Sequence, residues 1–199
     1  MVNSGKLNAA EQLATLEMVL EHQPIPTWTN AIDGGANCGD WAEVMAQKFE
    51  NVYAFEPAPD MMNQLWTRVQ KGVPNILLYE KALYSRHCWV DVVTPPKKTN
   101  PRSRFIQVKD SGSTEAVTVD SLGLETCGLL KLDLEGAEYD ALLGATATVQ
   151  RCKPVLIVEL DGHSIRFGHT VAQTVELVKS FGYKTAITRG PDWVFTPQE

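Results

Sequence analysis

Apolar positions along the chain fall into two alternating patterns, which predict strands and helices in turn. Short apolar runs have the form of buried strands, and LLKLDL and VLIVEL are nearly all apolar until their C-terminal ends. Longer segments with apolar residues three and four positions apart predict amphipathic helices. The expected strands lie within 28–35, 51–57, 75–83, 128–136, 154–162 and two stretches of 183–196, and the expected helices within 9–22, 39–50, 60–72, 137–150 and 170–182.

This alternation predicts an α/β fold, in which a doubly wound, mostly parallel sheet of about seven strands carries helices on both faces. The two strands within 183–196 are joined by a tight Arg-Gly-Pro-Asp turn, which is too short for a crossover helix. We therefore expect them to form an antiparallel C-terminal hairpin. No repeat or linker divides the chain, so we expect a single domain over residues 1–199.

Two segments lie outside the regular alternation. Residues 1–26 form an expected N-terminal helical extension, with a capping box at Asn8 and Glu11 and an end at Pro24 and Pro26. Residues 94–113 hold three prolines and several basic residues, including Lys97, Lys98, Arg102 and Arg104, and read as an irregular insertion loop. Short extended pieces are expected around this loop in WVDVV, FIQV and AVTVDSL.

Composition narrows the class of protein. The 199 residues carry a net charge of −6, which argues against binding to duplex nucleic acid. No run of about 18 apolar residues suggests a membrane span, and the N-terminus MVNSGKLNAAEQ lacks the apolar core of a signal peptide. The four cysteines are scattered and match no zinc spacing, which favours free thiols. We therefore expect a cytoplasmic protein that does not bind membranes.

The most informative segment is the glycine-containing turn from Asp33 to Asp40, directly after the first expected strand. Glycines allow a sharp turn and a close approach of a ligand to the main chain. Glu56 ends the next strand, where a carboxylate can accept hydrogen bonds from both hydroxyls of an adenosine ribose. Turn and acid together form a signature for a nucleoside cofactor.

Charge and spacing then favour S-adenosylmethionine (SAM) over a nicotinamide dinucleotide. The dinucleotide fingerprint G-x-G-x-x-G is absent, since a frame that starts at Gly34 meets Ala36 at the second glycine. A pyrophosphate would also be repelled by Asp33, Asp40 and Glu56. SAM carries a sulfonium and an ammonium, which these acids attract.

The quoted motifs resemble those of the FkbM-type methyltransferases. The resemblance rests on the segments DGGANCGD (33–40) and FEP (55–57), on VDSL (119–122) followed by KLDLEGAE (131–138), and on KPV to VE (153–159). It implies a Rossmann-like SAM-dependent methyltransferase fold and methyl transfer to hydroxyl oxygens. The expected cofactor-binding residues are Asp33, Gly34, Gly35, Ala36, Asn37, Gly39, Glu56, Pro57, Ala82, Leu83 and Asp133.

Three residues are candidates for catalysis. Asp133 and Glu135 end the fourth strand on one face, and the resemblance implies that Asp133 lies near the methionine part of SAM. Structural roles explain the same residues: Asp133 could pair with Lys131 or cap the next helix, and Glu135 and Glu138 could be first-turn acids favoured by the helix dipole. His163 follows the fifth strand and is a candidate general base.

A metal ion is not expected. Glu159 and Asp161 offer oxygen ligands beside Asp133, but they stand in an ordinary strand-to-loop run. The basic loop is read as solvated, with a lid or a contact for an anionic substrate as alternatives.

The leading hypothesis is a SAM-dependent O-methyltransferase that acts on a hydroxyl of a small molecule or carbohydrate. Two alternatives stay open: a nicotinamide-dependent oxidoreductase on a similar sheet, and a non-catalytic SAM-binding module.

Overall fold

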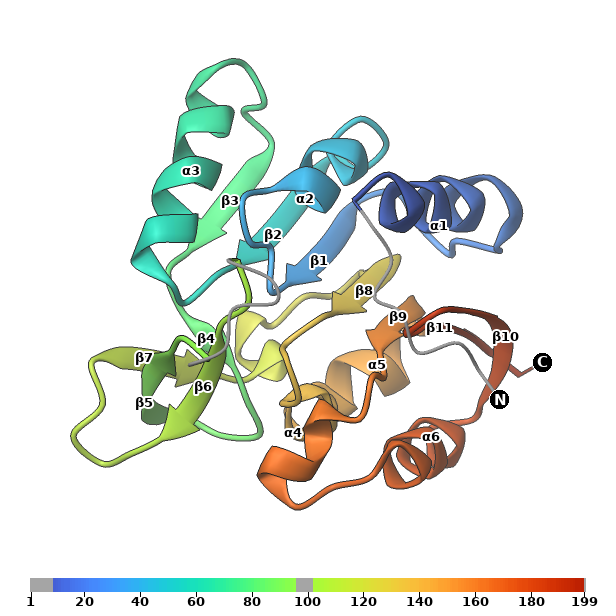
Figure 1. Cartoon of the computed structure of the whole chain (residues 1–199). Coiled ribbons are helices and arrows are strands. Elements are labelled where there is room, and N and C mark those ends of the chain that lie inside the picture. The colour runs from blue at the N-terminus through green and yellow to red at the C-terminus, as the bar shows by residue number, and fades with distance from the viewer. Residues whose placement is uncertain (1–8, 96–101, 199) are drawn as a thin grey trace.

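A computed structural model describes residues 9–95 and 102–198 (Figure 1). Its main sheet has seven strands in the order β10-β11-β9-β8-β1-β2-β3. The central strands are parallel, and only β10 and β11 run antiparallel to their neighbours. The bounds are β1 (Asn30–Gly34), β2 (Asn51–Phe55), β3 (Ile76–Tyr79), β8 (Leu129–Leu132), β9 (Val155–Glu159), β10 (Tyr183–Arg189) and β11 (Asp192–Pro197). The predicted mostly parallel sheet and its C-terminal hairpin are confirmed.

Helices cover both faces of this sheet, as alternating side chains along each strand require. Ala31 of β1 packs with the helices on one face, α1 (Ala9–His22), α2 (Asp40–Met45) and α3 (Pro59–Gln70). Its neighbour Ile32 packs on the opposite face, which is covered by α4 (Glu138–Leu143), α5 (Thr146–Cys152) and α6 (Val171–Ser180). In Figure 1 the first set lies along the top of the sheet and the second set below it.

A second sheet was not predicted. Four short strands, β4 (Ala82–Leu83), β5 (Cys88–Val93), β6 (Phe105–Val108) and β7 (Thr114–Val117), pair in the order β4-β7-β5-β6. Figure 1 shows this sheet beyond the carboxyl ends of β1, β2 and β3. Strand β6 lies inside the expected insertion 94–113, and the expected strand 75–83 is divided between the two sheets as β3 and β4.

Two other expected elements differ from the structure. The helix predicted over 137–150 is divided into α4 and α5 at Gly144, where a Cβ atom would lie 2.2 Å from the carbonyl oxygen of Tyr84. Residues Val119–Leu122, expected to be extended, form a 3₁₀ turn capped by the Thr118 side chain. Asp120 then accepts hydrogen bonds from Ala147 and Thr148 at the start of α5, which holds the turn in place.

Helix α1 ends at His22, before the two prolines, as predicted. The capping residue proposed for its start, Asn8, lies outside the described residues. Within the described ranges, each helix is too short or too polar to span a membrane.

Candidate active site

The glycine turn lies where the strand order of the main sheet reverses. Strand β1 pairs with β2 on one side and with β8 on the other, so the loops that follow β1 and β8 diverge above the sheet edge. Ligands of open α/β sheets bind in the crevice at such a switch point. The expected cofactor turn therefore occupies the position at which this fold type binds ligands.

Close packing explains why this turn contains Gly34 and Gly35. The amides of Gly35 and Ala36 both donate to the carbonyl oxygen of Phe55, at 2.9 Å each. Gly35 has φ +74°, and a Cβ there would lie 1.9 Å from the carbonyl oxygen of Asp133. A Cβ on Gly34 would lie 2.9 Å from a side-chain carbon of Leu83. The turn is thus packed main chain against main chain on the end of β8, and against the Leu83 side chain of β4.

Lys131 supports the turn from within the protein. Its ammonium lies 2.9 Å from Oδ1 of Asp33 and donates to the carbonyl oxygens of Gly34 and Gly35, at 3.2 and 2.9 Å. Both side chains of the ion pair are buried. Burial opposes the charge, but Asp33 and Asp133 outweigh it and raise the pKa of Lys131. Lys131 therefore pairs with Asp33, and the structural alternative that paired it with Asp133 is not what the structure shows.

Glu56 lies at the carboxyl end of β2, beside the turn. Its carboxylate accepts hydrogen bonds from the amide of Asn37 at 2.9 Å and from that of Ala58 at 2.8 Å. Asn37 adopts φ +52°, which aims its amide at the carboxylate. Burial raises the pKa of Glu56 to about 7, although the two amides and Lys131 act in the opposite direction. Pro57, which follows it, is half-buried.

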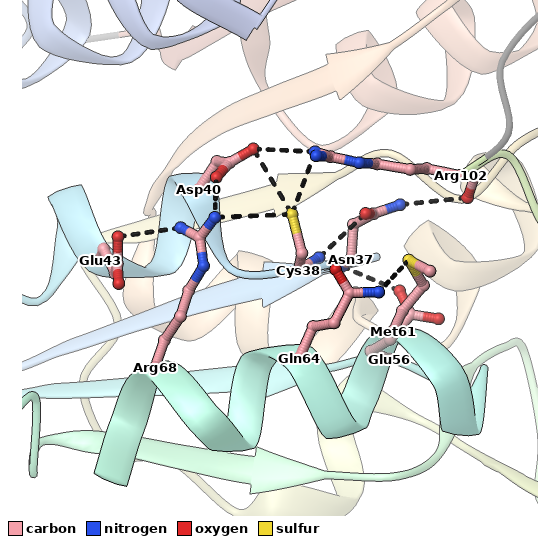
Figure 2. A network of polar contacts seen from close by, with 9 residues as sticks. All are labelled: Asn37, Cys38, Asp40, Glu43, Glu56, Met61, Gln64, Arg68 and Arg102. Carbon is pink, nitrogen blue, oxygen red and sulfur yellow. Dashed lines mark hydrogen bonds and ion pairs between the residues drawn. The ribbon is translucent and has the colours of Figure 1, made fainter. Parts of the chain in front are cut away.

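A polar network joins the turn to the segment before β6 (Figure 2). Arg102 places Nη1 3.1 Å from Sγ of Cys38 and 3.4 Å from Asp40, while its carbonyl oxygen accepts from the Asn37 side chain. On the other side, Arg68 of α3 pairs with Asp40 at 2.7 Å and with Glu43 at 2.9 Å. Arg102 of the basic segment is thus bound to the turn, while its side chain stays half exposed to solvent.

Further members of the expected cofactor set lie in the second sheet and in the turn itself. Ala82 and Leu83 are buried in β4, and Ala36 is buried in the turn itself. Gly39 caps α2 at φ +96°, and a Cβ there would meet the side chain of Leu65. Gly39 therefore allows α2 to approach α3.

The loop after β8 is anchored at both ends. The amide of Asp133, which is half-buried, donates to the carbonyl oxygen of Gly34 at 3.1 Å. Glu138 is buried and accepts from the amides of Leu134 and Gly136, at 2.7 and 3.1 Å. Burial raises its pKa to about 8. Glu138 lies in the first turn of α4, the structural role considered for it, and its side chain also holds the loop before that helix.

Between these anchors, Glu135 meets His163. Glu135 has φ +55°, an uncommon conformation for a residue with a side chain, and its Oε2 lies 3.1 Å from Nδ1 of His163. Asp161 approaches the same nitrogen at 2.7 Å, and its other oxygen accepts from the amide of His163. We name Glu135, Asp161 and His163 the acceptor-side triad. Its three ligand atoms lie within 4.8 Å of one another, so these side chains could hold a metal ion.

Sequence reasoning nominated Glu135 and His163 separately and missed that Asp161 joins them. Their meeting depends on close contact between two loops, because a Cβ on Gly136 would lie 2.6 Å from the carbonyl oxygen of His163. Arg166 was also missed: it donates to the carbonyl oxygen of Glu135 at 2.8 Å and lies over the ring of Phe105. No local motif indicates either contact.

Comparison with known proteins identifies similar sequences and structures. The family model of the methyltransferase FkbM domain matches residues 33–185. No curated protein matches the chain. Among solved structures, the methyltransferase FkbM from Methylobacillus flagellatus KT has a TM-score of 0.54 at 18% identity. The alignment covers 84% of this chain but only 42% of that one.

Two other structures confirm the predicted fold over nearly the whole chain. A precorrin-6y C5,15-methyltransferase from Geobacter metallireducens GS-15 has a TM-score of 0.56 at 11% identity, covering 94% of this chain and 88% of that chain. Magnesium protoporphyrin IX methyltransferase from Synechocystis PCC 6803, solved with bound SAM, has a TM-score of 0.53 at 11% identity, covering 98% and 86%. The main sheet with its C-terminal hairpin is therefore that of the SAM-dependent methyltransferases.

Proposed function

The chain belongs to the FkbM methyltransferase family, and from this premise we propose that it transfers a methyl group from SAM to a hydroxyl oxygen of a small molecule or carbohydrate. One observation carries the proposal: the glycine turn, Glu56 and Asp133 meet at the switch point of the sheet, with the acceptor-side triad on the same edge. We also propose that the protein acts in the cytoplasm.

The cofactor would bind across the ends of β1, β2 and β8. Glu56 would accept hydrogen bonds from the ribose hydroxyls, and Ala82 and Leu83 would line the adenine side. Gly35, Asn37 and Asp133 would face the methionine part, where the carboxylate of Asp133 attracts the ammonium and the sulfonium. Asp33 is fully buried and paired with Lys131, so it would support the turn without touching the cofactor. The remaining residues of the expected set, Gly34, Ala36, Gly39 and Pro57, would shape the turn.

Methyl transfer to oxygen is an in-line displacement, so alignment of acceptor oxygen, methyl carbon and sulfur supplies most of the acceleration. As the new C–O bond forms and the S–C bond breaks, the hydroxyl proton leaves. We assign the activation of the hydroxyl to the acceptor-side triad, because it holds the catalytic candidates Glu135 and His163 together with Asp161. Either an imidazole base or a bound cation can perform this step.

Isothermal titration with S-adenosylhomocysteine, SAM and NAD tests the cofactor. We expect binding of the first two and no binding of NAD. Binding of NAD alone would return the chain to the oxidoreductase alternative. Transfer of a labelled methyl group to a panel of hydroxyl acceptors, with matched amine acceptors beside them, then tests the acceptor class. Labelling of the amines only would contradict O-methyl transfer.

A further inference from the structure

We propose that the acceptor-side triad of Glu135, Asp161 and His163 binds a divalent metal ion. The proposal departs from the expectation that the protein has no metal. Its role in methyl transfer rests on the proposed function, whereas the binding itself does not.

The first argument is convergence. One ligand atom from each of the three side chains lies within 4.8 Å of the other two, and Nδ1 of His163 is 2.7 and 3.1 Å from the two carboxylates. An ion with metal–ligand distances of about 2.0–2.2 Å fits between atoms at such separations after small side-chain rotations. Two carboxylates and one imidazole suit Mn²⁺, Mg²⁺ or Zn²⁺.

The second argument comes from His163 itself. Two carboxylate oxygens face the same ring nitrogen, whose single hydrogen can be shared between them only in a weaker, three-centre hydrogen bond. In the structure, the buried Nδ1 forms no aligned hydrogen bond with either oxygen. A base oriented by a carboxylate needs one such hydrogen bond. A metal ion instead takes the lone pair of Nδ1 and both carboxylates at once.

The third argument is charge. Two carboxylates that face one neutral imidazole nitrogen repel each other, and a cation bound between them offsets this repulsion. The guanidinium of Arg166 lies 4.0 Å from the carboxylate of Glu135 and donates to the main-chain carbonyl oxygen of the same residue. The side chain of Glu135 is about nine-tenths buried, so water screens the charge poorly. A divalent ion would neutralise the pair.

The loop geometry presents such an ion to an acceptor. The triad follows the carboxyl ends of β8 and β9, two residues beyond Asp133 along the first of these loops. The ion would bind the acceptor oxygen and lower its pKa, so the hydroxyl proton passes to solvent water as the methyl group arrives. The products are the methyl ether, S-adenosylhomocysteine and one proton. His163 would then act as a ligand through Nδ1 and not as the general base.

Electron paramagnetic resonance of Mn²⁺ tests the binding directly, since free Mn²⁺ gives a six-line signal that binding removes. We expect one Mn²⁺ per chain in the wild type, and at least a tenfold weaker affinity in His163→Ala and Asp161→Asn. His169→Ala is the matched control, because His169 also faces a carboxylate, Asp140 at 3.4 Å, without a place in the triad. It should bind Mn²⁺ like the wild type.

Binding of S-adenosylhomocysteine and thermal unfolding, measured on the same samples, report whether each variant is folded. Absence of Mn²⁺, Mg²⁺ and Zn²⁺ binding at millimolar concentration in a folded wild type would overturn the proposal, as would unchanged binding in both triad variants. Metal binding without any binding of S-adenosylhomocysteine would refute the proposed function and leave the metal site standing.

Discussion

The ammonium of Lys131 lies 2.9 Å from the carboxylate of Asp33 and also donates to the carbonyl oxygen of Gly35, so one buried ion pair fixes the position of the cofactor turn. The pair joins β8 to β1, the two strands at the switch point of the sheet. Because both side chains are buried, each depends on the other for compensation of its charge.

We therefore predict that Lys131→Met lowers the free energy of unfolding by about 3–5 kcal/mol, since it leaves Asp33 buried without its counter-ion. Urea unfolding followed by circular dichroism measures the change. The double variant Asp33→Asn, Lys131→Met removes both charges, so its free energy of unfolding should fall clearly less than that of Lys131→Met alone. Equal losses in the single and the double variant would show that the ion pair is not the source of the stability.

The second prediction concerns Gly35. Alanine there would place Cβ 1.9 Å from the carbonyl oxygen of Asp133 and would also occupy the left-handed region at φ +74°. The conformation costs about 1–2 kcal/mol, and the overlap adds about 1–3 kcal/mol by overpacking. Thermal and urea unfolding should show a loss of stability, and titration should show loss of S-adenosylhomocysteine binding.

Gly123→Ala separates these two contributions. Gly123 has φ +62°, but a Cβ there meets nothing within 4 Å, so only the conformational cost applies. Gly123→Ala should lose less stability than Gly35→Ala and should keep its affinity for S-adenosylhomocysteine. Equal effects of both substitutions would contradict the close packing inferred at the turn.

Glu56 makes ligand binding dependent on pH. Its pKa is raised to about 7 in the folded protein, so between about pH 4.5 and 7 the folded state holds a proton that the unfolded state has lost. Glu56 therefore lowers stability as the pH rises through this window. Ribose hydroxyls donate to the ionised carboxylate, so ligand binding should release this proton. The affinity for the ligand should therefore increase with pH, by at most about tenfold per pH unit below 7.

Titrations of S-adenosylhomocysteine at pH 6, 7 and 8 in buffers of different ionisation enthalpy measure both the affinity and the released proton. Asp192 and Glu138 also have raised pKa values, about 7 and about 8, and could contribute to the same pH dependence. The variant Glu56→Gln therefore isolates the contribution of Glu56. The variant should bind more weakly at pH 8 and show a flatter dependence on pH. An identical pH profile in wild type and variant would remove Glu56 from the ribose site.

Much of the main sheet is predictable because it follows from periodicity. Strands such as β8 and β9 are buried on both faces, so their sequences are almost wholly apolar, and each begins within one residue of its predicted start. Their ends come earlier than predicted, at Leu132 and Glu159, because the residues that follow belong to the site loops. The second sheet is not predictable in this way. Its strand β4 is only two residues long and pairs with β7 far along the chain, and no local pattern carries that pairing.

The candidate site likewise has one part that local sequence predicts and one part that it does not. The cofactor turn consists of consecutive residues, so its chemistry can be read from the sequence. The acceptor-side triad depends on the left-handed conformation of Glu135 and on the approach of two loops. A single histidine in a sequence gives no sign of which carboxylates it will meet, so the contact between Asp161 and His163 and the role of Arg166 were not predicted.

The last prediction concerns Arg102, whose side chain is half exposed and bridges the segment before β6 to the cofactor turn. Contacts between described residues that join them are those of the guanidinium to Asp40, of the guanidinium to Cys38, and of the Asn37 side chain to the Arg102 carbonyl. Arg102→Ala removes the first two and keeps the third. Exposed ion pairs are worth about 0.2–1 kcal/mol, so the free energy of unfolding should change little.

The rate of S-adenosylhomocysteine release is the more sensitive measurement, because the bridge crosses the turn that the ligand must leave. We expect stopped-flow displacement to show release faster by about two- to fivefold in Arg102→Ala, the kinetic equivalent of losing one such ion pair. Lys109→Ala is the matched control, since Lys109 forms a similar pair with Asp91 at 2.9 Å in the second sheet, away from the turn. If both variants released the ligand at the wild-type rate, Arg102 would hold the β6 segment in place without controlling the release of the cofactor. Faster release in both variants would indicate a general loosening of the second sheet.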